Sequence, residues 1–138
     1  MMQLTRAYFF SASHRLHVPE FSDEKNQALF GKCNNPYGHG HNYRIEISVK
    51  GKIDERTGRV VDLAAMDSLV NEHVVRYFDH KYINQDVPEF KTLVATTEVL
   101  GEVIHERLLA VWPTEFPALE KVGIQETKRN RFTIPASN

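Results

Sequence analysis

The fold of this chain is decided by the stretch Gly38-His39-Gly40-His41-Asn42-Tyr43-Arg44-Ile45-Glu46-Ile47-Ser48-Val49. Its large apolar residues fall on every second position, which is the period of a strand with one buried face. His39 and His41 continue that parity, so both imidazoles are expected to point toward the buried side where the strand begins. Two histidines on one face of a strand can bind a metal ion together.

Two further segments are predicted to be strands. The aromatic-rich run from Leu4 ends at His14, which is a candidate third imidazole from a neighbouring strand. A hairpin is expected over residues 121–134, with its turn at Lys128-Arg129-Asn130. After a turn at residues 54–59, Val60 and Val61 are predicted to form a short strand that completes another hairpin.

Helical spacing marks two segments. Asp62 is an expected N-cap for a helix that runs to about Tyr77, and Thr97 is an expected N-cap for a second helix that ends before Pro113. The connection over residues 17–36 is expected to hold one helical turn at residues 24–29. The order β-β-β-α-α-β-β predicts an α+β fold, with a mainly antiparallel sheet and the helices on one face.

Composition limits the function classes. The 138 residues predict a single domain over residues 1–138, and a formal net charge of −1 argues against bulk attraction to nucleic acid or to a membrane surface. One cysteine cannot form an intramolecular disulfide. The start of the chain has no apolar signal core, and no apolar run is long enough for a membrane span. We therefore expect a cytoplasmic protein.

Three imidazoles with one coordination position open would suit a catalytic zinc ion. Cys33 then has two interpretations: a fourth ligand that closes a structural site, or a thiolate base or nucleophile beside an open one. Lys32 and the polar loop around it favour the second interpretation, because a neighbouring cation lowers a thiol pKa.

Asp79-His80 and Glu126 are the remaining candidates. Asp79 can orient the His80 imidazole so that it takes a thiol proton, although a histidine past a helix end is also favoured by the helix dipole. Glu126 lies on the apolar parity of its strand, where a carboxylate needs a partner such as a ligand with two adjacent N–H donors. Alternatively, the strand has already reached solvent there.

Together these segments resemble the 6-pyruvoyl-tetrahydropterin synthase family. The matching stretches are residues 10–16 (FSASHRL), 30–36 (FGKCNNP), 38–43 (GHGHNY), 79–81 (DHK), 96–98 (TTE) and 126–127 (ET). They cover nearly the whole chain in the family's order. Phe78 departs from the leucine that the family usually has there.

The resemblance implies the tunnelling fold, in which a four-stranded antiparallel sheet carries two helices on one face. Subunits form a trimeric barrel, two trimers stack into a homo-hexamer, and active sites lie at subunit interfaces. It further implies that His14, His39 and His41 bind zinc and that Cys33 is the thiolate that abstracts a proton. Asp79 and His80 would form a proton relay that reaches a neighbouring subunit's site. Glu126 would bind the pterin ring, assisted by Thr97 and Glu98.

The implied reaction converts 7,8-dihydroneopterin triphosphate to 6-pyruvoyl-tetrahydropterin with loss of triphosphate. It needs no redox cofactor and allows Mg²⁺ with the triphosphate, for which the candidate cations are Arg15, Lys32, Lys81, Lys128 and Arg129. A related branch of queuosine biosynthesis, 6-carboxytetrahydropterin synthase, uses the same substrate and releases acetaldehyde. The spacing between Cys33 and His39 favours the pyruvoyl-forming type, whereas Val99 favours the carboxy-forming type. A third branch of the family is an aldolase that has glutamate in place of the cysteine, and Cys33 argues against it.

Two other classes of function remain as alternatives. One is a non-catalytic pterin-binding module on the same fold, against which the joint presence of thiol, relay pair and three histidines argues. The other is an unrelated zinc hydrolase in which Cys33 is a metal ligand.

Overall fold

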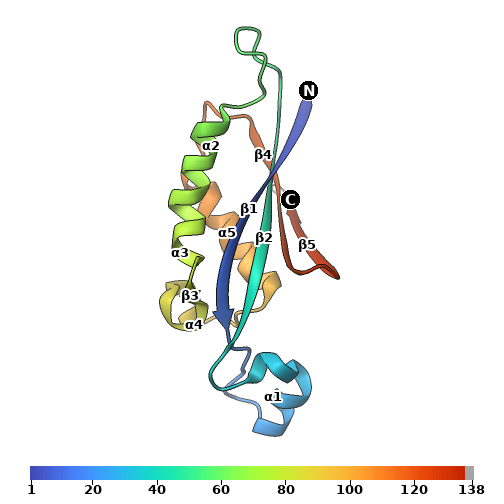
Figure 1. Ribbon diagram of the computed structural model, residues 1–138, viewed down its shortest axis with the longest axis vertical. Helices are drawn as coiled ribbons and strands as arrows, with labels where there is room; N and C mark the ends of the chain where they lie inside the picture. The colour runs from blue at the N-terminus through green and yellow to red at the C-terminus, as the bar shows by residue number, and fades with distance from the viewer. Residues whose placement is uncertain (136–138) are drawn as a thin grey trace.

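A computed structural model of the protein describes residues 1–135 and contains a five-stranded sheet (Figure 1). Four strands pair antiparallel in the order β1, β2, β4, β5, with bounds β1 Met2–His14, β2 His39–Gly51, β4 Ala118–Thr127 and β5 Asn130–Pro135. The fifth strand, β3 (Lys81–Tyr82), pairs parallel with β1 through Ala12 and Ser13. The expected antiparallel strands are therefore present, and the sheet has one more strand than the four predicted.

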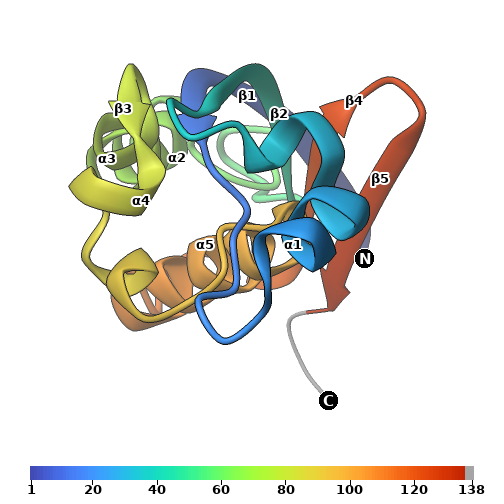
Figure 2. The same ribbon diagram turned by 90° about the horizontal axis from the view of Figure 1, so that it is seen from below.

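Two long helical segments cover the same face of the sheet (Figures 1 and 2). The first comprises α2 (Leu63–Val70), a π-helical segment η2 (Asn71–Val75) and α3 (Arg76–Phe78), and the second is α5 (Thr97–Val111). The shorter elements are α1 (Asp23–Phe30), the 3₁₀ helices η1 (Gly31–Asn34) and η3 (Pro88–Lys91), and α4 (Ile83–Asp86). None of the helices within residues 1–135 has the length and apolarity that a bilayer span requires.

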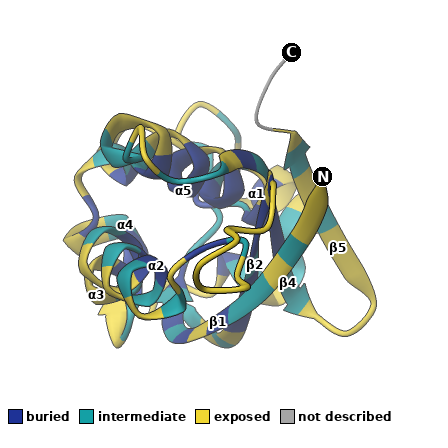
Figure 3. Ribbon diagram, turned by 90° about the horizontal axis from the view of Figure 1, so that it is seen from above, coloured by how far each residue is buried: buried dark blue, intermediate teal, exposed yellow. Residues whose placement is uncertain are grey.

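The core lies between the sheet and these helices. The predicted parity of β2 is confirmed, because Tyr43, Ile45, Ile47 and Val49 are fully buried. On β1, Phe10 is buried, whereas Phe9 beside it on the opposite face is 62% exposed. Figure 3 shows buried residues gathered where α2 and α5 face the sheet. This parity places His14 and His41 on the helix-covered side.

The predicted strand at Val60 and Val61 is wrong. Both residues lie in bends, and Val61 is buried in the core without joining the sheet. The physical reason is that β2 is a central strand with β1 on one edge and β4 on the other, so no edge is left for pairing. The chain must also turn at Asp62, whose carboxylate accepts a hydrogen bond from Ala65 N at 3.2 Å and caps α2 as predicted.

The cap of α5 differs by one residue from the prediction. The Thr96 hydroxyl accepts a hydrogen bond from Val99 N at 3.2 Å, so Thr96 is the N-cap and Thr97 is the first helical residue. Either threonine can cap a helix, and sequence alone does not choose between adjacent candidates. As a result, the Thr97 side chain does not cap the helix and can contact another group.

Candidate active site

The pairing of β1 with β2 brings the three histidines to one end of the sheet. His14 lies opposite His39 in the register, and His41 is two residues further along β2. The ring centroids of His14 and His41 are 5.0 Å apart, and those of His39 and His41 are 4.4 Å apart. The shared face that strand parity predicts for His39 and His41 is therefore present, and the register of β1 brings His14 beside them.

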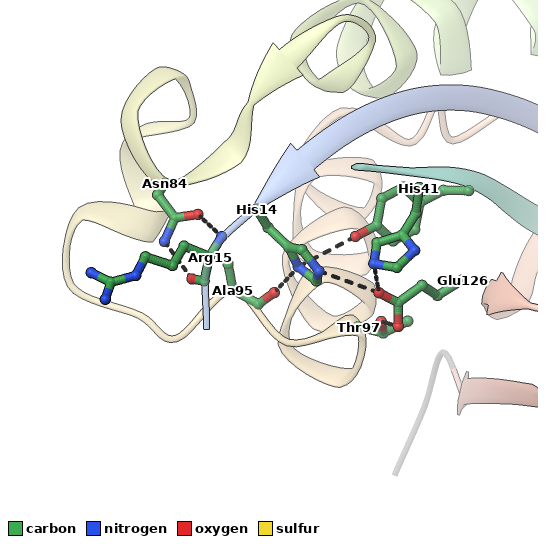
Figure 4. Close-up of polar contacts among 8 residues, drawn as sticks. His14, Arg15, His41, Asn84, Ala95, Thr97 and Glu126 are labelled. Atoms are coloured by element: carbon green, nitrogen blue, oxygen red, sulfur yellow. Dashed lines mark hydrogen bonds and ion pairs between the residues drawn. The ribbon is translucent and has the colours of Figure 1, made fainter. Parts of the chain in front are cut away.

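His14 is held in one tautomer. Its ring is 1% exposed, and Nδ1 lies 2.8 Å from the carbonyl oxygen of Ala95 (Figure 4). A carbonyl can only accept, so Nδ1 must carry the proton, and the Nε2 lone pair points into the site. A backbone acceptor behind a histidine is the usual arrangement for an imidazole that binds a metal through its other nitrogen.

Glu126 reaches into the same site from β4. Its Oε2 accepts a hydrogen bond from the Thr97 hydroxyl at 2.9 Å, and its Oε1 lies 3.3 Å from His14 Nε2 and 2.5 Å from His41 Nε2 (Figure 4). The side chain is 22% exposed. The strand has therefore not reached solvent at this position, and the carboxylate lies on the helix-covered face.

The donor atoms fit a metal ion. His14 Nε2, His41 Nε2 and Glu126 Oε1 are buried and have no hydrogen-bond partner among the described residues. The ligand atoms of His14, Cys33, His41 and Glu126 all lie within 4.8 Å of one another. A lone pair facing a carboxylate at close range is unfavourable unless a cation or proton lies between them. Imidazole nitrogen, thiolate sulfur and carboxylate oxygen are the ligands that zinc prefers.

His39 is not a member of that four-residue group. Its ring packs edge-on against His41, and it is less buried than His14. The structure thus places His39 beside the group, on the same face of β2, while Cys33 and Glu126 lie within it.

The electrostatics of the thiol differ from the sequence-based expectation. Burial, followed by the negative charge of Glu126, raises the pKa of Cys33, whereas the neighbouring Lys32 was expected to lower it. Burial also lowers the pKa of His41, which favours the neutral, metal-binding form of this imidazole. Burial alone would raise the pKa of Glu126, but the close approach of His14, the Thr97 hydroxyl and His41 lowers it overall.

Asp79 and His80 form a separate pair at the β3 edge. Asp79 Oδ2 lies 3.0 Å from His80 Nδ1, and Asp79 Oδ1 accepts a hydrogen bond from Ser11 N at 3.0 Å. His80 has a φ of +58° and is bonded through its backbone N–H to Ser11 O, so its ring projects outward with 82% exposure. His80 lines an open depression of about 650 Å³ together with Ser13 and Asn42.

Glu98 lies in the first turn of α5 and is exposed, next to Thr97. Sequence reasoning missed the Ala95 carbonyl and the buried Asn34, because neither a backbone oxygen nor a loop amide carries a signal of its own. The only sequence feature that could have pointed to Asn34 is its position directly after Cys33.

Comparison with known proteins is consistent with this geometry. A family model described as 6-pyruvoyl tetrahydropterin synthase matches residues 3–136. The chain is 45% identical over 128 residues to the 6-pyruvoyl tetrahydrobiopterin synthase of Homo sapiens, covering 93% of this chain and 87% of that protein. The solved structure of the Caenorhabditis elegans 6-pyruvoyl tetrahydropterin synthase superposes with a TM-score of 0.89, at 40% identity over 99% of this chain and 96% of that one.

A shorter match points to the related branch. It covers 49 residues, 36% of this chain and 41% of that protein, at 41% identity, and belongs to an Archaeoglobus fulgidus protein whose name assigns it provisionally to the 6-carboxy-5,6,7,8-tetrahydropterin synthases.

Proposed function

The chain belongs to the 6-pyruvoyl tetrahydropterin synthase family and is a lyase of that type, and we propose that it converts 7,8-dihydroneopterin triphosphate to 6-pyruvoyl-tetrahydropterin with elimination of triphosphate. The observation that carries the proposal is the convergence of His14, Cys33, His41 and Glu126 around one point, with their ligand atoms within 4.8 Å of one another. Imidazoles, a thiol and a carboxylate at one point supply a metal site, a base and a polar anchor together.

We propose that His14, His39 and His41 hold a catalytic zinc ion. The fixed tautomer of His14 and the neutral form favoured at His41 both support this assignment. Bound zinc would act as a Lewis acid that polarises the side-chain hydroxyls of the substrate and acidifies the neighbouring C–H bonds. Mg²⁺ would accompany the triphosphate, and no redox cofactor is required, because oxidation of the side chain reduces the ring within the same molecule.

Cys33 is the proposed base. Its thiolate would take a proton from a side-chain carbon and return it elsewhere on the substrate. Burial and the negative charge of Glu126 raise the pKa of Cys33, which favours the thiol form. A divalent cation in the site would offset the charge of Glu126 and favour the thiolate.

Glu126 is the proposed anchor for the amino-pyrimidine edge of the pterin. Its two oxygens can accept two parallel N–H bonds, and Thr97 fixes the plane of the carboxylate from one side. Glu98 would assist from the exposed first turn of α5. Arg15, Lys32, Lys81, Lys128 and Arg129 remain the candidate contacts of the triphosphate.

Asp79 and His80 are the proposed proton relay. The Asp79 carboxylate holds the proton on His80 Nδ1, which leaves Nε2 of the outward-facing ring to accept a proton from another group. The exposure of that ring supports a role at a neighbouring subunit's site. We therefore propose a homo-hexamer built of two trimers, in the cytoplasm, with its active sites at subunit interfaces.

The deciding experiment is product identification by mass spectrometry after incubation of the zinc-loaded protein with 7,8-dihydroneopterin triphosphate. Formation of 6-pyruvoyl-tetrahydropterin and triphosphate is expected. A 6-carboxytetrahydropterin product with acetaldehyde would identify the alternative branch, toward which Val99 leans. Cys33→Ala should still bind the pterin but lose turnover, and unchanged turnover in this variant would refute the base assignment.

Two controls separate the remaining classes of function. A purified protein that binds pterin but forms no product with zinc present would indicate a non-catalytic binding module. Replacement of zinc by Co²⁺ tests whether Cys33 is a ligand, because a thiolate ligand gives a near-ultraviolet charge-transfer band that imidazole ligands do not. A band that disappears in Cys33→Ala would support the structural-ligand interpretation of this residue.

A further inference from the structure

The turn that carries Cys33 lies outside the sheet. It belongs to η1, which follows α1 in the long connection between β1 and β2, and Figure 1 shows this connection extending beyond the end of the sheet. Strand pairing therefore does not fix the position of the Cys33 backbone. Where the sulfur lies depends on how η1 is attached to the rest of the molecule.

A segment held by side-chain hydrogen bonds lies beside this turn. The ring of His14 is bonded to the Ala95 carbonyl, and the backbone of the next residue, Arg15, makes two hydrogen bonds of 2.8 Å with the side-chain amide of Asn84 (Figure 4). These bonds fix the chain directly after the predicted metal ligand. Residues 15–17, called the anchor segment below, can therefore hold a neighbouring segment in place.

Asn34 joins the turn to this anchor segment. Its side-chain Nδ2 donates to the Leu16 carbonyl at 2.8 Å and lies 3.0 Å from Nδ1 of His17. Next to it, Leu16 N donates to the Cys33 carbonyl at 2.7 Å, and Arg15 Nε donates to the Asn34 carbonyl at 3.2 Å. Four hydrogen bonds thus connect three consecutive residues after His14 with Cys33 and Asn34.

The orientation of the Asn34 amide follows from its partners. A flipped amide would place Oδ1 against the Leu16 carbonyl, so that two acceptors would face each other at hydrogen-bond distance. The residue is only 6% exposed, so water cannot easily replace either bond. One amide proton is therefore bonded to Leu16 O, and the other is directed at His17 Nδ1, which accepts it when the His17 proton is on Nε2. No other amino acid offers two donors at this length.

We propose that Asn34 is a positioning residue that holds the Cys33 thiol at the distance from His14 that the reaction requires. The inference rests on the proposed role of Cys33 as the base. Misplacement of a reacting group by about 1 Å costs about 100-fold in rate, so loss of this connection is expected to lower kcat more than it raises KM.

The test uses Asn34→Ala, Asn34→Asp and the control Asn35→Ala. The aspartate keeps the shape of the side chain but cannot donate to Leu16. Asn35 is exposed, and its side chain accepts a bond from Tyr37 N instead of contacting the anchor segment. Because Cys33 is the only cysteine in the chain, its alkylation rate by iodoacetamide at a fixed pH reports this sulfur alone.

In both Asn34 variants, zinc content per chain should stay at the wild-type level and the alkylation rate should change by at least about threefold. The value of kcat should fall by about 10- to 100-fold, with KM within about threefold of wild type. Asn35→Ala should match the wild type in all three measurements.

Three results would overturn the proposal. The first is an unchanged alkylation rate and kcat in both Asn34 variants. The second is an equal effect of Asn35→Ala. The third is loss of the folded state in both Asn34 variants, because Asn34 would then serve the fold in general. Should Cys33→Ala retain turnover, the base assignment fails by that result alone, while the alkylation rate still reports whether Asn34 fixes the sulfur.

Discussion

The Thr97 hydroxyl donates a hydrogen bond of 2.9 Å to Oε2 of Glu126 and leaves Oε1 turned toward His14 and His41. The donor comes from α5 and the acceptor from β4, so a helix–sheet contact sets the plane of the carboxylate. Thr96, one residue earlier, has the different task of capping the helix. The two adjacent threonines therefore make separate contacts: Thr96 caps the helix, and Thr97 orients the Glu126 carboxylate.

Thr97→Val is expected to raise KM for the pterin substrate by about tenfold and to change kcat less. The isosteric valine removes the donor, and a hydrogen bond to a charged group is worth about 1.5–3 kcal/mol. Steady-state kinetics with 7,8-dihydroneopterin triphosphate measure both constants. Thr97→Ser keeps the hydroxyl and should behave as the wild type.

Thr96→Ala is the matched control for this prediction. Loss of the N-cap should lower the free energy of unfolding by about 1 kcal/mol without changing KM. Thermal unfolding and the same kinetic assay separate the two effects. Equal KM values in Thr96→Ala and Thr97→Val would contradict the assignment of Thr97 to the orientation of Glu126.

Glu126→Gln should shift the alkylation profile of Cys33 in the metal-free protein to lower pH. Burial is the largest cause of the raised pKa of Cys33, and the negative charge of Glu126 adds to it. A nearby carboxylate disfavours the thiolate, so its neutralisation must lower the thiol pKa. The rate of reaction with iodoacetamide as a function of pH gives the midpoint.

Glu98→Gln provides the control for this charge effect, because Glu98 is exposed on the first turn of α5. Its midpoint should equal that of the wild type. A Glu126→Gln profile that stays in place or moves to higher pH would show that the carboxylate does not act on the thiol.

Sequence periodicity predicted the parts of the site that lie on regular strands. Alternation along β2 placed His39 and His41 on the buried face, and the aromatic run of β1 placed His14 at its end. The same argument put Glu126 on the face of Val122 and Ile124. These predictions succeed because side chains of a strand alternate whatever the sheet packs against.

The features that failed or were missed depend on contacts between distant segments. Val60 and Val61 have strand propensity, but β2 has no free edge for them. The two-residue β3 exists only because Ala12 and Ser13 lie beside it. The pKa of Cys33 was expected to follow its sequence neighbour Lys32, whereas burial and Glu126 determine it. Such effects arise only in the folded chain, so no short stretch of sequence predicts them.

Glu89→Gln should destabilise the protein near neutral pH by about 1 kcal/mol. Arg107 on α5 donates two hydrogen bonds of 2.8 Å to the Glu89 carboxylate, and its guanidinium lies 4.7 Å from the centre of the Tyr77 ring. The Arg107 hydrogen bonds are the largest cause of the lowered pKa of Glu89. This ion pair between Glu89 and Arg107 links η3 to α5.

The stability that the Glu89–Arg107 ion pair contributes depends on pH in a direction set by the lowered pKa of Glu89. A carboxyl group with a lowered pKa in the folded state contributes stability above its ordinary value of 4.5, and that contribution is lost as the pH falls through the folded-state pKa. The difference between wild type and Glu89→Gln in urea unfolding should therefore shrink toward zero under acid conditions. Glu106→Gln, an exposed change on the same helix, should have no effect at either pH. A difference that grows on acidification would contradict the ion-pair explanation.

Removal of metal should lower both activity and thermal stability. Nε2 of His14 and Nε2 of His41 have no hydrogen-bond partner among the described residues and come together in the folded state only, so a bound ion stabilises that state. Free zinc at about 100 times its Kd should add about 2.7 kcal/mol, equivalent to about 10 °C in Tm. Calorimetry before and after chelation, with zinc added back, measures the shift. In His14→Ala the zinc-dependent shift should disappear, whereas His73→Ala, a change in η2, should keep it; an equal shift in both variants would show that the ion binds elsewhere.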